Sequence, residues 1–194
     1  MPPLDNNWLI KMFGRVTFYP TLVYNVMMEK MSSRRWFDRI DENVILGALP
    51  WRSITNQLIH EEKVKGVVSM NENFELLFGV TTRKEWNKLN VKFLQLNTAD
   101  IFHAPSQEKI QKGVEFIQQF DGTENSVYVH CKAGRTRSAT LVACYLIEKY
   151  NMTPKEAVDF IASKRPHILL RSAQWSAIDT FYSDKNFKSL DGPS

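Results

Sequence analysis

The sequence predicts an α/β fold in which helices flank a central, mostly parallel sheet of about four or five strands. Short apolar runs alternate with longer segments whose apolar residues recur at helical spacing. One run, Ser-Val-Tyr-Val-His at residues 126–130, is largely apolar, as expected of a strand that is buried on both faces. The 194 residues, 43% of them hydrophobic, are enough for one domain with a sizeable core.

The first half of the chain contains three predicted strands and one predicted helix. The strands are residues 44–46, 66–70 and 92–96, which are short and mainly apolar. Thr82 and Glu85 form a capping-box pattern between the second and third strands. Because this pattern satisfies the first amides of a helix, it predicts that a helix begins after Thr82.

The second half contains the strand at 126–130 and four predicted helices. One helix follows this strand after a tight loop of seven residues and covers residues 139–147. The other three are marked by start or stop residues. Pro105 and Ser106 begin the first, Thr153, Pro154 and Glu156 begin the second, Pro166 ends the second, and the third spans about 173–182.

The composition excludes several classes of protein. Eight glycines and eight prolines exclude collagen-like and low-complexity chains. A net charge of +4, with no Lys or Arg run longer than two residues, is mild for a nucleic-acid-binding protein, so no nucleic-acid partner is expected. Two cysteines, Cys131 and Cys144, cannot form a disulfide scaffold, which indicates a reducing compartment. The four histidines lack the spacing of metal ligands, so we expect no metal.

The first 35 residues carry most of the net charge. They contain five basic and two acidic residues, a net of +3, whereas the rest of the chain is nearly neutral. An acid-poor, basic, amphipathic start resembles a mitochondrial targeting segment, and a surface helix that packs on the domain is the alternative. A membrane-spanning helix fits poorly, because the stretch 16–28 has 13 residues and includes Pro20. The chain thus divides into a targeting or membrane-associating segment at 1–35, a globular domain at 36–185 and a flexible tail at 186–194.

Cys131 stands where the strand at 126–130 gives way to a helix. Here the loop amides and the positive end of the helix dipole point to the sulfur and favour the reactive thiolate. Ala133 and Gly134 are small enough for those amides to converge into a nest for an anion. Arg137, six residues after the cysteine, can fold back as a planar fork for two phosphate oxygens. By contrast, Cys144 falls inside a helical pattern and is expected to be a buried small hydrophobe.

The stretch from His130 to Ser138 reads His-Cys-Lys-Ala-Gly-Arg-Thr-Arg-Ser and resembles the H-C-x-x-G-x-x-R-S/T signature of cysteine-dependent dual-specificity phosphatases. The resemblance implies a dual-specificity-phosphatase-like domain at 36–185 and a phosphocysteine intermediate on Cys131. It also implies that Arg137 and the loop amides bind phosphate, and that the Ser138 hydroxyl helps the thiolate leave. His130 would order the loop by hydrogen bonding and would not be the base. The residues expected to bind substrate are Lys132, Ala133, Gly134, Arg135 and Thr136.

The leaving oxygen of a phosphate ester needs a proton, so we expect a carboxylic acid on a loop that faces the cysteine. Asp100 directly follows the predicted strand 92–96 and therefore projects from the edge of the sheet where Cys131 should lie. The superfamily carries its acid at a similar separation before the cysteine. An Asp in a solvated turn is the alternative, and Asp121, which precedes a glycine, fits a turn better than an acid.

The charge of the loop bears on the substrate. Lys132 and Arg135 add two cations beside Arg137, more than one phosphotyrosine needs. The pattern C-K-A-G-[K/R]-x-R resembles lipid-directed members of the superfamily, in which the extra charge suits anionic headgroups. The alternative is that these charges only increase the affinity for phosphate.

Outside the cysteine loop, five further blocks carry a second resemblance, at residues 18–22, 36–41, 46–50, 70–72 and 98–100. Together with the cysteine loop they resemble the mitochondrial phosphatidylglycerophosphate phosphatase family. The resemblance implies an enzyme without cofactors that converts phosphatidylglycerophosphate to phosphatidylglycerol, on the route to cardiolipin. It implies an anionic phospholipid substrate and a place at the membrane surface, on the matrix side of the mitochondrial inner membrane.

One loop departs from the family pattern. The family has an acidic-acidic-aromatic-acidic loop after the strand at 66–70, and here it reads Glu72-Asn73-Phe74-Glu75. The loss of one carboxylate and one phenol puts in doubt whether this loop holds the catalytic arginine. Glu72 and Glu75 are the candidates, and a solvated loop is the alternative. Arg171 and Gln174, near the start of the last helix, are more typical of helix-start residues than of substrate contacts.

Two other functions are open on the sequence. A dual-specificity protein phosphatase for phosphotyrosine, phosphoserine or phosphothreonine would use the same loop. A phosphate-binding protein without activity is the non-enzymatic alternative. The joint presence of Cys131, Arg137 and Asp100 argues against the second, because each has a distinct role in turnover.

Overall fold

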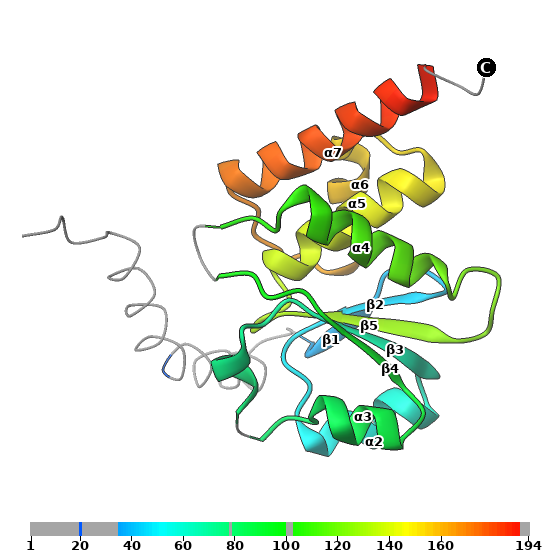
Figure 1. The fold of residues 1–194 in the computed structure, drawn as a ribbon, viewed down its shortest axis with the longest axis vertical. Coiled ribbons are helices and arrows are strands. Elements are labelled where there is room, and N and C mark those ends of the chain that lie inside the picture. Colours follow the sequence, from blue (N-terminus) through cyan, green and yellow to red (C-terminus); the bar gives the residue numbers. More distant parts are fainter. Residues whose placement is uncertain (1–19, 21–34, 78, 100–102, 191–194) are drawn as a thin grey trace, which may run out of the picture.

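Five strands form the central sheet, which has the order β1 (Phe37–Arg39), β2 (Val44–Gly47), β5 (Ser126–His130), β3 (Val64–Ser69) and β4 (Lys92–Gln95) (Figure 1). The computed structural model describes residues 20, 35–77, 79–99 and 103–190. β1 is antiparallel to β2, and all other neighbouring strands are parallel. The predicted α/β fold with a mostly parallel sheet is therefore confirmed.

Helices cover both faces of the sheet (Figure 1). Tyr128 of β5 packs in a core with Trp86, whereas Val127 and Val129 pack in a larger core on the opposite face. Successive side chains of a strand point to opposite faces, so β5 is buried on both sides, as its apolar sequence predicts. The smaller core lies under α2 (Arg52–His60) and α3 (Arg83–Lys88), and the larger one under α4 (Gln107–Gln118), α5 (Arg137–Tyr150), α6 (Pro154–Lys164) and α7 (Ser172–Leu190).

The middle of the larger layer is α5, which follows the cysteine loop directly. Every residue from Arg137 to Ile147 is buried, because α5 packs on the sheet and is contacted by α4, α6 and α7. A helix enclosed in this way is fixed in direction by its neighbours. The loop between β5 and α5 therefore has both ends held by the core.

The capping residues predict the helix starts correctly. Thr82 and Glu85 form a capping box at the start of α3, and Thr153 and Glu156 form another at the start of α6. Ser106 caps α4 by accepting a hydrogen bond from a backbone amide of the first turn. All four predicted strands are also present, within two residues at each end.

Two elements lie outside the sequence-based prediction. β1 has three residues and pairs only at the edge of the sheet, which is too short for a periodic pattern. α2 follows Trp51, whose side chain makes no capping hydrogen bond, so the sequence contains no helix start there. Both elements are stabilised by tertiary packing instead of local sequence.

The last helix is longer than predicted. α7 continues past Tyr182 to Leu190, and so includes residues 186–190 of the predicted flexible tail. Lys185 explains the extension, because its Nζ donates to the carbonyls of Ile147 (2.8 Å) and Glu148 (3.3 Å) at the end of α5. Residues 191–194 of the tail, and nearly all of the N-terminal segment, lie outside the described residues.

A polar network fixes the C-terminal half of α5 to the rest of the domain. The Tyr145 hydroxyl donates to Asp41 (3.1 Å) and to Asp121 (3.0 Å), and Lys149 Nζ pairs with Asp121 at 3.0 Å. Burial, together with the two carboxylates, raises the pKa of Tyr145. Asp121 thus has a structural role at its turn, as its position before a glycine predicts.

Candidate active site

Cys131 is the first residue after β5, at the carboxyl end of the central strand, and only 3% of it is exposed. α5 begins six residues later at Arg137. The predicted order of strand, tight loop and helix is therefore present. Residues 131–136, together with the first turn of α5, are called the phosphate loop below.

The carbonyl groups of the phosphate loop are held from outside. Four consecutive carbonyls, those of residues 132–135, accept hydrogen bonds from other parts of the chain, and the carbonyl of Thr136 accepts the amide of Thr140 in the first turn of α5. In a trans peptide the C=O of one residue and the N–H of the next point in opposite directions. The amides of residues 133–137 are therefore turned to the inner side of the loop, which is the arrangement of an anion-binding nest. The donors are the amides of Leu49, Thr140 and Leu169 and the guanidinium of Arg165.

Gly134 is required at the centre of this loop. Its φ is +64°, a conformation that residues with a Cβ rarely adopt. A Cβ at this position would also collide with the carbonyl group of Gly47 and the nitrogen of Ala48. The loop thus packs backbone against backbone on the end of β2.

Arg137 is fully buried and held by three groups. Its Nη1 and Nη2 donate to the two carboxylate oxygens of Glu75, at 2.8 and 3.0 Å. Nη1 also donates to the carbonyls of Thr98 (2.9 Å) and Met70 (3.3 Å). A bidentate pair of this kind fixes the plane of the guanidinium, so the arginine has a defined orientation in the absence of any ligand.

The carboxylate that holds Arg137 comes from the loop that departs from the family pattern. Glu75 lies in a short 3₁₀ helix, η1 (Asn73–Leu76), and is 2% exposed. Its Oε2 also accepts the amide of Glu72 at 2.7 Å, and Glu72 in turn caps the amide of Glu75. The solvated-loop alternative is therefore wrong for Glu75: this single carboxylate reaches the arginine without the residues that the loop lacks.

Ser138 contacts the sulfur directly. Its Oγ donates to Cys131 Sγ at 3.2 Å, and the side chain is buried at the first turn of α5. A hydroxyl in this place stabilises negative charge on the sulfur, whether the thiolate is free or leaving.

His130 is buried at the end of β5. Its ring centroid lies 5.7 Å from that of Tyr128. The main chain of Cys131 acts on the ring as a hydrogen-bond partner, but outside the geometry of a well-aligned hydrogen bond. Burial lowers the pKa of His130 to about 3, and the charge of Arg137 acts in the same direction. The imidazole is therefore neutral near pH 7 and a very weak base, while its main-chain carbonyl accepts the Met70 amide at 2.9 Å.

The remaining loop residues have structural contacts of their own. Arg135 Nε donates to the carbonyl of His167 at 2.7 Å, and Thr136 Oγ1 donates to that of Leu169 at 3.0 Å. Lys132 is largely buried, at 8% exposure. The side chains of Arg135 and Thr136 thus hold the segment after α6 against the loop, a role that the sequence does not indicate.

Asp100, the predicted acid, lies outside the described residues. The described residues on either side of 100–102 are held by hydrogen bonds. The Thr98 amide donates to Met70 O (3.2 Å), and the His103 carbonyl accepts from Gln174 Nε2 (3.0 Å). Gln174 also accepts the amide of Arg171 at 3.1 Å, which is the helix-start role expected for it.

Two further features of the described chain are not part of this site. Cys144 is buried inside α5, and burial raises the pKa of its thiol, so it does not supply a thiolate. No group of three or more His, Cys, Asp or Glu side chains among the described residues is arranged to hold a metal ion.

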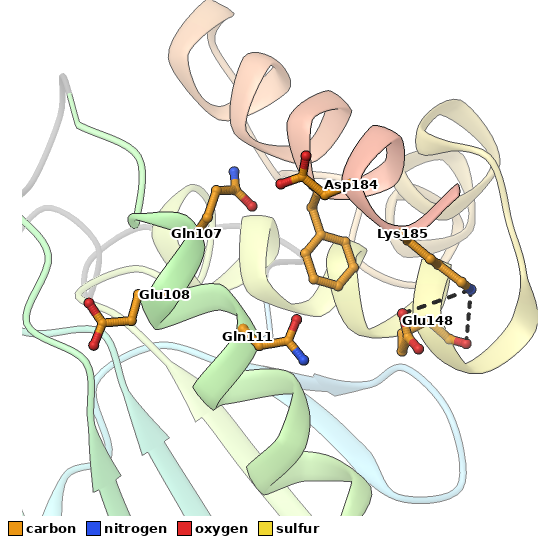
Figure 2. Close-up of a pocket in the computed structure, with 7 residues that line it drawn as sticks. Gln107, Glu108, Gln111, Glu148, Asp184 and Lys185 are labelled. Carbon is orange, nitrogen blue, oxygen red and sulfur yellow. Dashed lines mark hydrogen bonds and ion pairs between the residues drawn. The ribbon is translucent and has the colours of Figure 1, made fainter. Parts of the chain in front are cut away.

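A separate hollow of about 470 Å³ lies between α4 and α7, near the C-terminal end of α5 (Figure 2). Its Glu148 lies eleven residues after Arg137 in α5, about 16 Å along the helix. It contains no nucleophile, and Lys185 is held there by the last carbonyls of α5. It is therefore distinct from the phosphate loop. Its lining residues are Gln107, Glu108, Gln111, Glu148, Phe181, Asp184 and Lys185.

Comparison with known proteins agrees with this geometry. The family model described as "Dual specificity phosphatase, catalytic domain" matches residues 57–184. The chain is 43% identical over 180 residues to "Phosphatidylglycerophosphatase and protein-tyrosine phosphatase 1" of Mus musculus, which covers 91% of this chain and 93% of that protein. It is 43% identical to "Phosphatidylglycerophosphate phosphatase PTPMT1" of Arabidopsis thaliana, over 91% of this chain and 52% of that one.

A solved structure is similar over most of the described domain. "Crystal Structure of PTPMT1 in complex with PI(5)P" superposes with a TM-score of 0.78 at 42% sequence identity, covering 80% of this chain and 99% of the other. The likeness in fold therefore accompanies a substantial likeness in sequence.

Proposed function

The chain belongs to the dual specificity phosphatase family, and from this premise we propose that it dephosphorylates phosphatidylglycerophosphate to phosphatidylglycerol through a phosphocysteine intermediate. The observation that carries the proposal is the phosphate loop. There, a nucleophilic cysteine, inward-facing amides and a pre-oriented arginine come together at one sheet edge.

The chemistry follows from the positions of these groups. The Cys131 thiolate attacks phosphorus in line, so that the S–P bond forms while the bond to the leaving oxygen breaks. Asp100 gives its proton to that oxygen, and Arg137 with the loop amides stabilises the charge on the phosphoryl oxygens. Water then attacks phosphorus, Asp100 takes a proton from it, and the thiolate leaves with the Ser138 hydroxyl donating to the sulfur.

Two observations support a phospholipid as the substrate. The mouse and Arabidopsis relatives are both named for action on phosphatidylglycerophosphate, and the similar crystal structure contains a phosphoinositide. The loop itself adds Lys132 and Arg135 to the charge of Arg137, which suits an anionic headgroup. The name of the mouse relative also includes protein-tyrosine phosphatase, which favours phosphotyrosine as the second candidate substrate.

We further propose that residues 1–35 direct the protein to the mitochondrial inner membrane, on the matrix side, and that 36–185 form the catalytic domain. The support is the acid-poor, basic and amphipathic sequence of this segment, with its net charge of +3. None of the helices in the described part of the chain is long and apolar enough to cross a membrane. Fractionation of cells that express residues 1–35 fused to a reporter protein tests the location, and a reporter that stays outside mitochondria would overturn it.

The nucleophile is tested with the two cysteines of the chain. Phosphate release from phosphatidylglycerophosphate in vesicles should be abolished by Cys131→Ser, because an alcohol at this position is not ionised. Cys144→Ala is the matched control, since this thiol is buried in α5 and should be dispensable for turnover. Retained activity in Cys131→Ser would remove the assignment.

The role of Asp100 as the acid is tested with substrates that differ in their leaving group. Asp100→Ala should slow hydrolysis of an alkyl phosphate much more than that of an aryl phosphate such as p-nitrophenyl phosphate, whose leaving oxygen needs no proton. The two kcat values for each protein give the comparison directly. Equal slowing of both esters would assign the proton transfer to another group.

A further inference from the structure

Arg165 donates hydrogen bonds to main-chain carbonyls of the phosphate loop. It is the residue that ends α6 and is only 1% exposed. Its Nε donates to the carbonyl of Gly134 at 2.8 Å, and its Nη2 donates to that of Ala133 at 3.1 Å. One edge of the planar guanidinium thus donates hydrogen bonds to two consecutive carbonyls at the turn of the loop. No local sequence pattern indicates this contact, because the acceptors lie 31 and 32 residues earlier in the chain.

A buried carboxylate holds the other end of the guanidinium. Arg165 Nη1 donates to Asp38 Oδ2 at 2.6 Å and to the carbonyl of Arg35 at 3.2 Å. Asp38 lies in β1, is 4% exposed and also pairs with the side chain of Arg35 at 2.6 Å. A buried pair of this kind contributes little net stability, because the cost of desolvation offsets the attraction. Its main consequence here is geometric: it fixes Arg165 between β1 and the loop.

The two carbonyls matter because of the amides that follow them. When the carbonyls of Ala133 and Gly134 point outward to Arg165, the amides of Gly134 and Arg135 point inward. Without this hold, either peptide could rotate and turn a carbonyl oxygen toward the bound phosphate, which is a repulsive contact. Gly134 also packs against the end of β2, so contacts from two different parts of the fold restrict this turn of the loop.

We propose that Arg165 is a positioning residue of the phosphatase: it does not touch the substrate but fixes the inward orientation of two amides that bind phosphate. Asp38 is its anchor. The inference rests on the proposed phosphatase function, since it assigns a role in the same site. This positioning role requires the planar guanidinium of an arginine. The single ammonium of a lysine cannot donate to two carbonyls and, at the opposite end, to a carboxylate.

The test is Arg165→Lys, which keeps the buried charge near Asp38 and loses the fork. Binding of inorganic phosphate is measured by calorimetry in a Cys131→Ser background, and kcat and KM for p-nitrophenyl phosphate are measured with the cysteine present. We expect phosphate affinity and kcat/KM to fall by at least about tenfold, as for the loss of oriented backbone donors at an oxyanion site. Asp38→Asn leaves both carbonyl contacts in place and should give a smaller loss in the same direction.

Lys149→Met is the matched control. It removes a cation from the other buried network, at the far end of α5, where no phosphate-loop residue takes part. This variant should have a lower Tm with unchanged phosphate affinity. Arg165→Lys should instead lose phosphate affinity while still unfolding in a single cooperative transition.

Several results would overturn the proposal. One is phosphate binding by folded Arg165→Lys that equals that of the parent, and another is an equal loss of affinity in Lys149→Met, which would show a general effect of destabilisation. If Arg165→Lys does not fold, Asp38→Asn decides: weaker phosphate binding supports the role, and unchanged binding overturns it. Failure of the proposed function is distinguishable from these results, because the wild-type protein would then release no phosphate from any monoester.

Discussion

Arg137 and Glu75 form a fully buried, bidentate ion pair at the centre of the site. Neither charge is screened by solvent, so each depends on the other for its stability in the interior. The pair also sets the plane of the guanidinium that the proposed mechanism places against phosphate. At this position we therefore expect stability and catalysis to depend on the same two side chains.

Glu75→Gln should damage both properties. Removal of one partner leaves a buried charge uncompensated, which typically costs about 3–5 kcal/mol of stability. We also expect kcat/KM to fall by at least about tenfold, because Arg137 loses the carboxylate that fixes its orientation. Urea unfolding and steady-state kinetics measure the two effects.

Glu72→Gln is the control for this variant. Glu72 lies in the same loop, but its carboxylate caps the Glu75 amide and does not contact Arg137. A glutamine oxygen can accept the same bond, so kcat/KM should change little. Similar losses in both variants would mean that the loop as a whole, and not the Glu75 carboxylate, holds the arginine.

His130 predicts a specific dependence of stability on pH. Its pKa falls from about 6.5 in the unfolded chain to about 3 in the folded one, through burial. Between these values only the unfolded chain binds the proton, so stability decreases as the pH falls through this window. From pH 7 to pH 5 this one group should cost about 2 kcal/mol.

His130→Gln removes this titration and should lose about 2 kcal/mol less than the wild type between pH 7 and pH 5 in urea unfolding. An identical slope in His130→Gln and in the wild type would contradict the buried, neutral state of this imidazole.

For individual residues, the sequence predicts the site residues that share a local motif and misses those that come together only in the folded chain. Cys131, Arg137 and Ser138 stand in one short stretch, and the loop that they form is present. The partner of Arg137 depends on how η1 approaches α5, 62 residues apart in the chain. Sequence alone therefore leaves Glu72 and Glu75 as equal candidates.

Among the structural elements, the phosphate loop is constrained by several other parts of the fold. It is enclosed by β2, by the end of α6 and by the segment around Leu169, all through hydrogen bonds or backbone contacts to its main chain. A change in its backbone should therefore affect activity before it affects the rest of the fold.

Gly134→Ala tests this constraint. The positive φ costs about 1–2 kcal/mol for a residue with a Cβ, and the collision with Gly47 adds to it, so the loop must shift. We expect kcat/KM to fall by at least about tenfold. Measurement of kcat/KM and Tm for the variant and the wild type separates the local effect from general instability.

Gly122→Ala provides the comparison, since its φ is +71° but nothing lies within 4 Å of the added Cβ. It should lower stability by about 1 kcal/mol and leave kcat/KM unchanged. If Gly134→Ala were as active as Gly122→Ala, the loop would be more adaptable than its contacts indicate.

The sequence predicts the elements whose starts are marked by their own side chains, and it misses the features that depend on contacts with distant residues. α3, α4 and α6 have side chains that cap their first turns, and a single sequence is enough to find them. β1 and α2 have no such residues, and α7 is extended by the contact of Lys185 with α5. These depend on neighbours that the local sequence does not specify.

For the molecule as a whole, the parallel sheet explains where the site lies. The carboxyl ends of β5 and β3 meet at one edge, so Cys131 and the residues after β3 that hold Arg137 converge there. The net charge of +4 is concentrated in the N-terminal segment and in the phosphate loop, and is not spread over the surface in a way typical of nucleic-acid binding. Its placement fits the anionic headgroup of a phospholipid substrate.

Action on a phospholipid is tested most directly by a comparison of two substrates with one protein. The values of kcat/KM are measured for phosphatidylglycerophosphate in mixed micelles and for a phosphotyrosine peptide, with Cys131→Ser as the blank. We predict a value for the lipid that is at least about tenfold higher, a difference of about 1.4 kcal/mol in transition-state binding. A higher value for the peptide would contradict the account and favour a protein phosphatase.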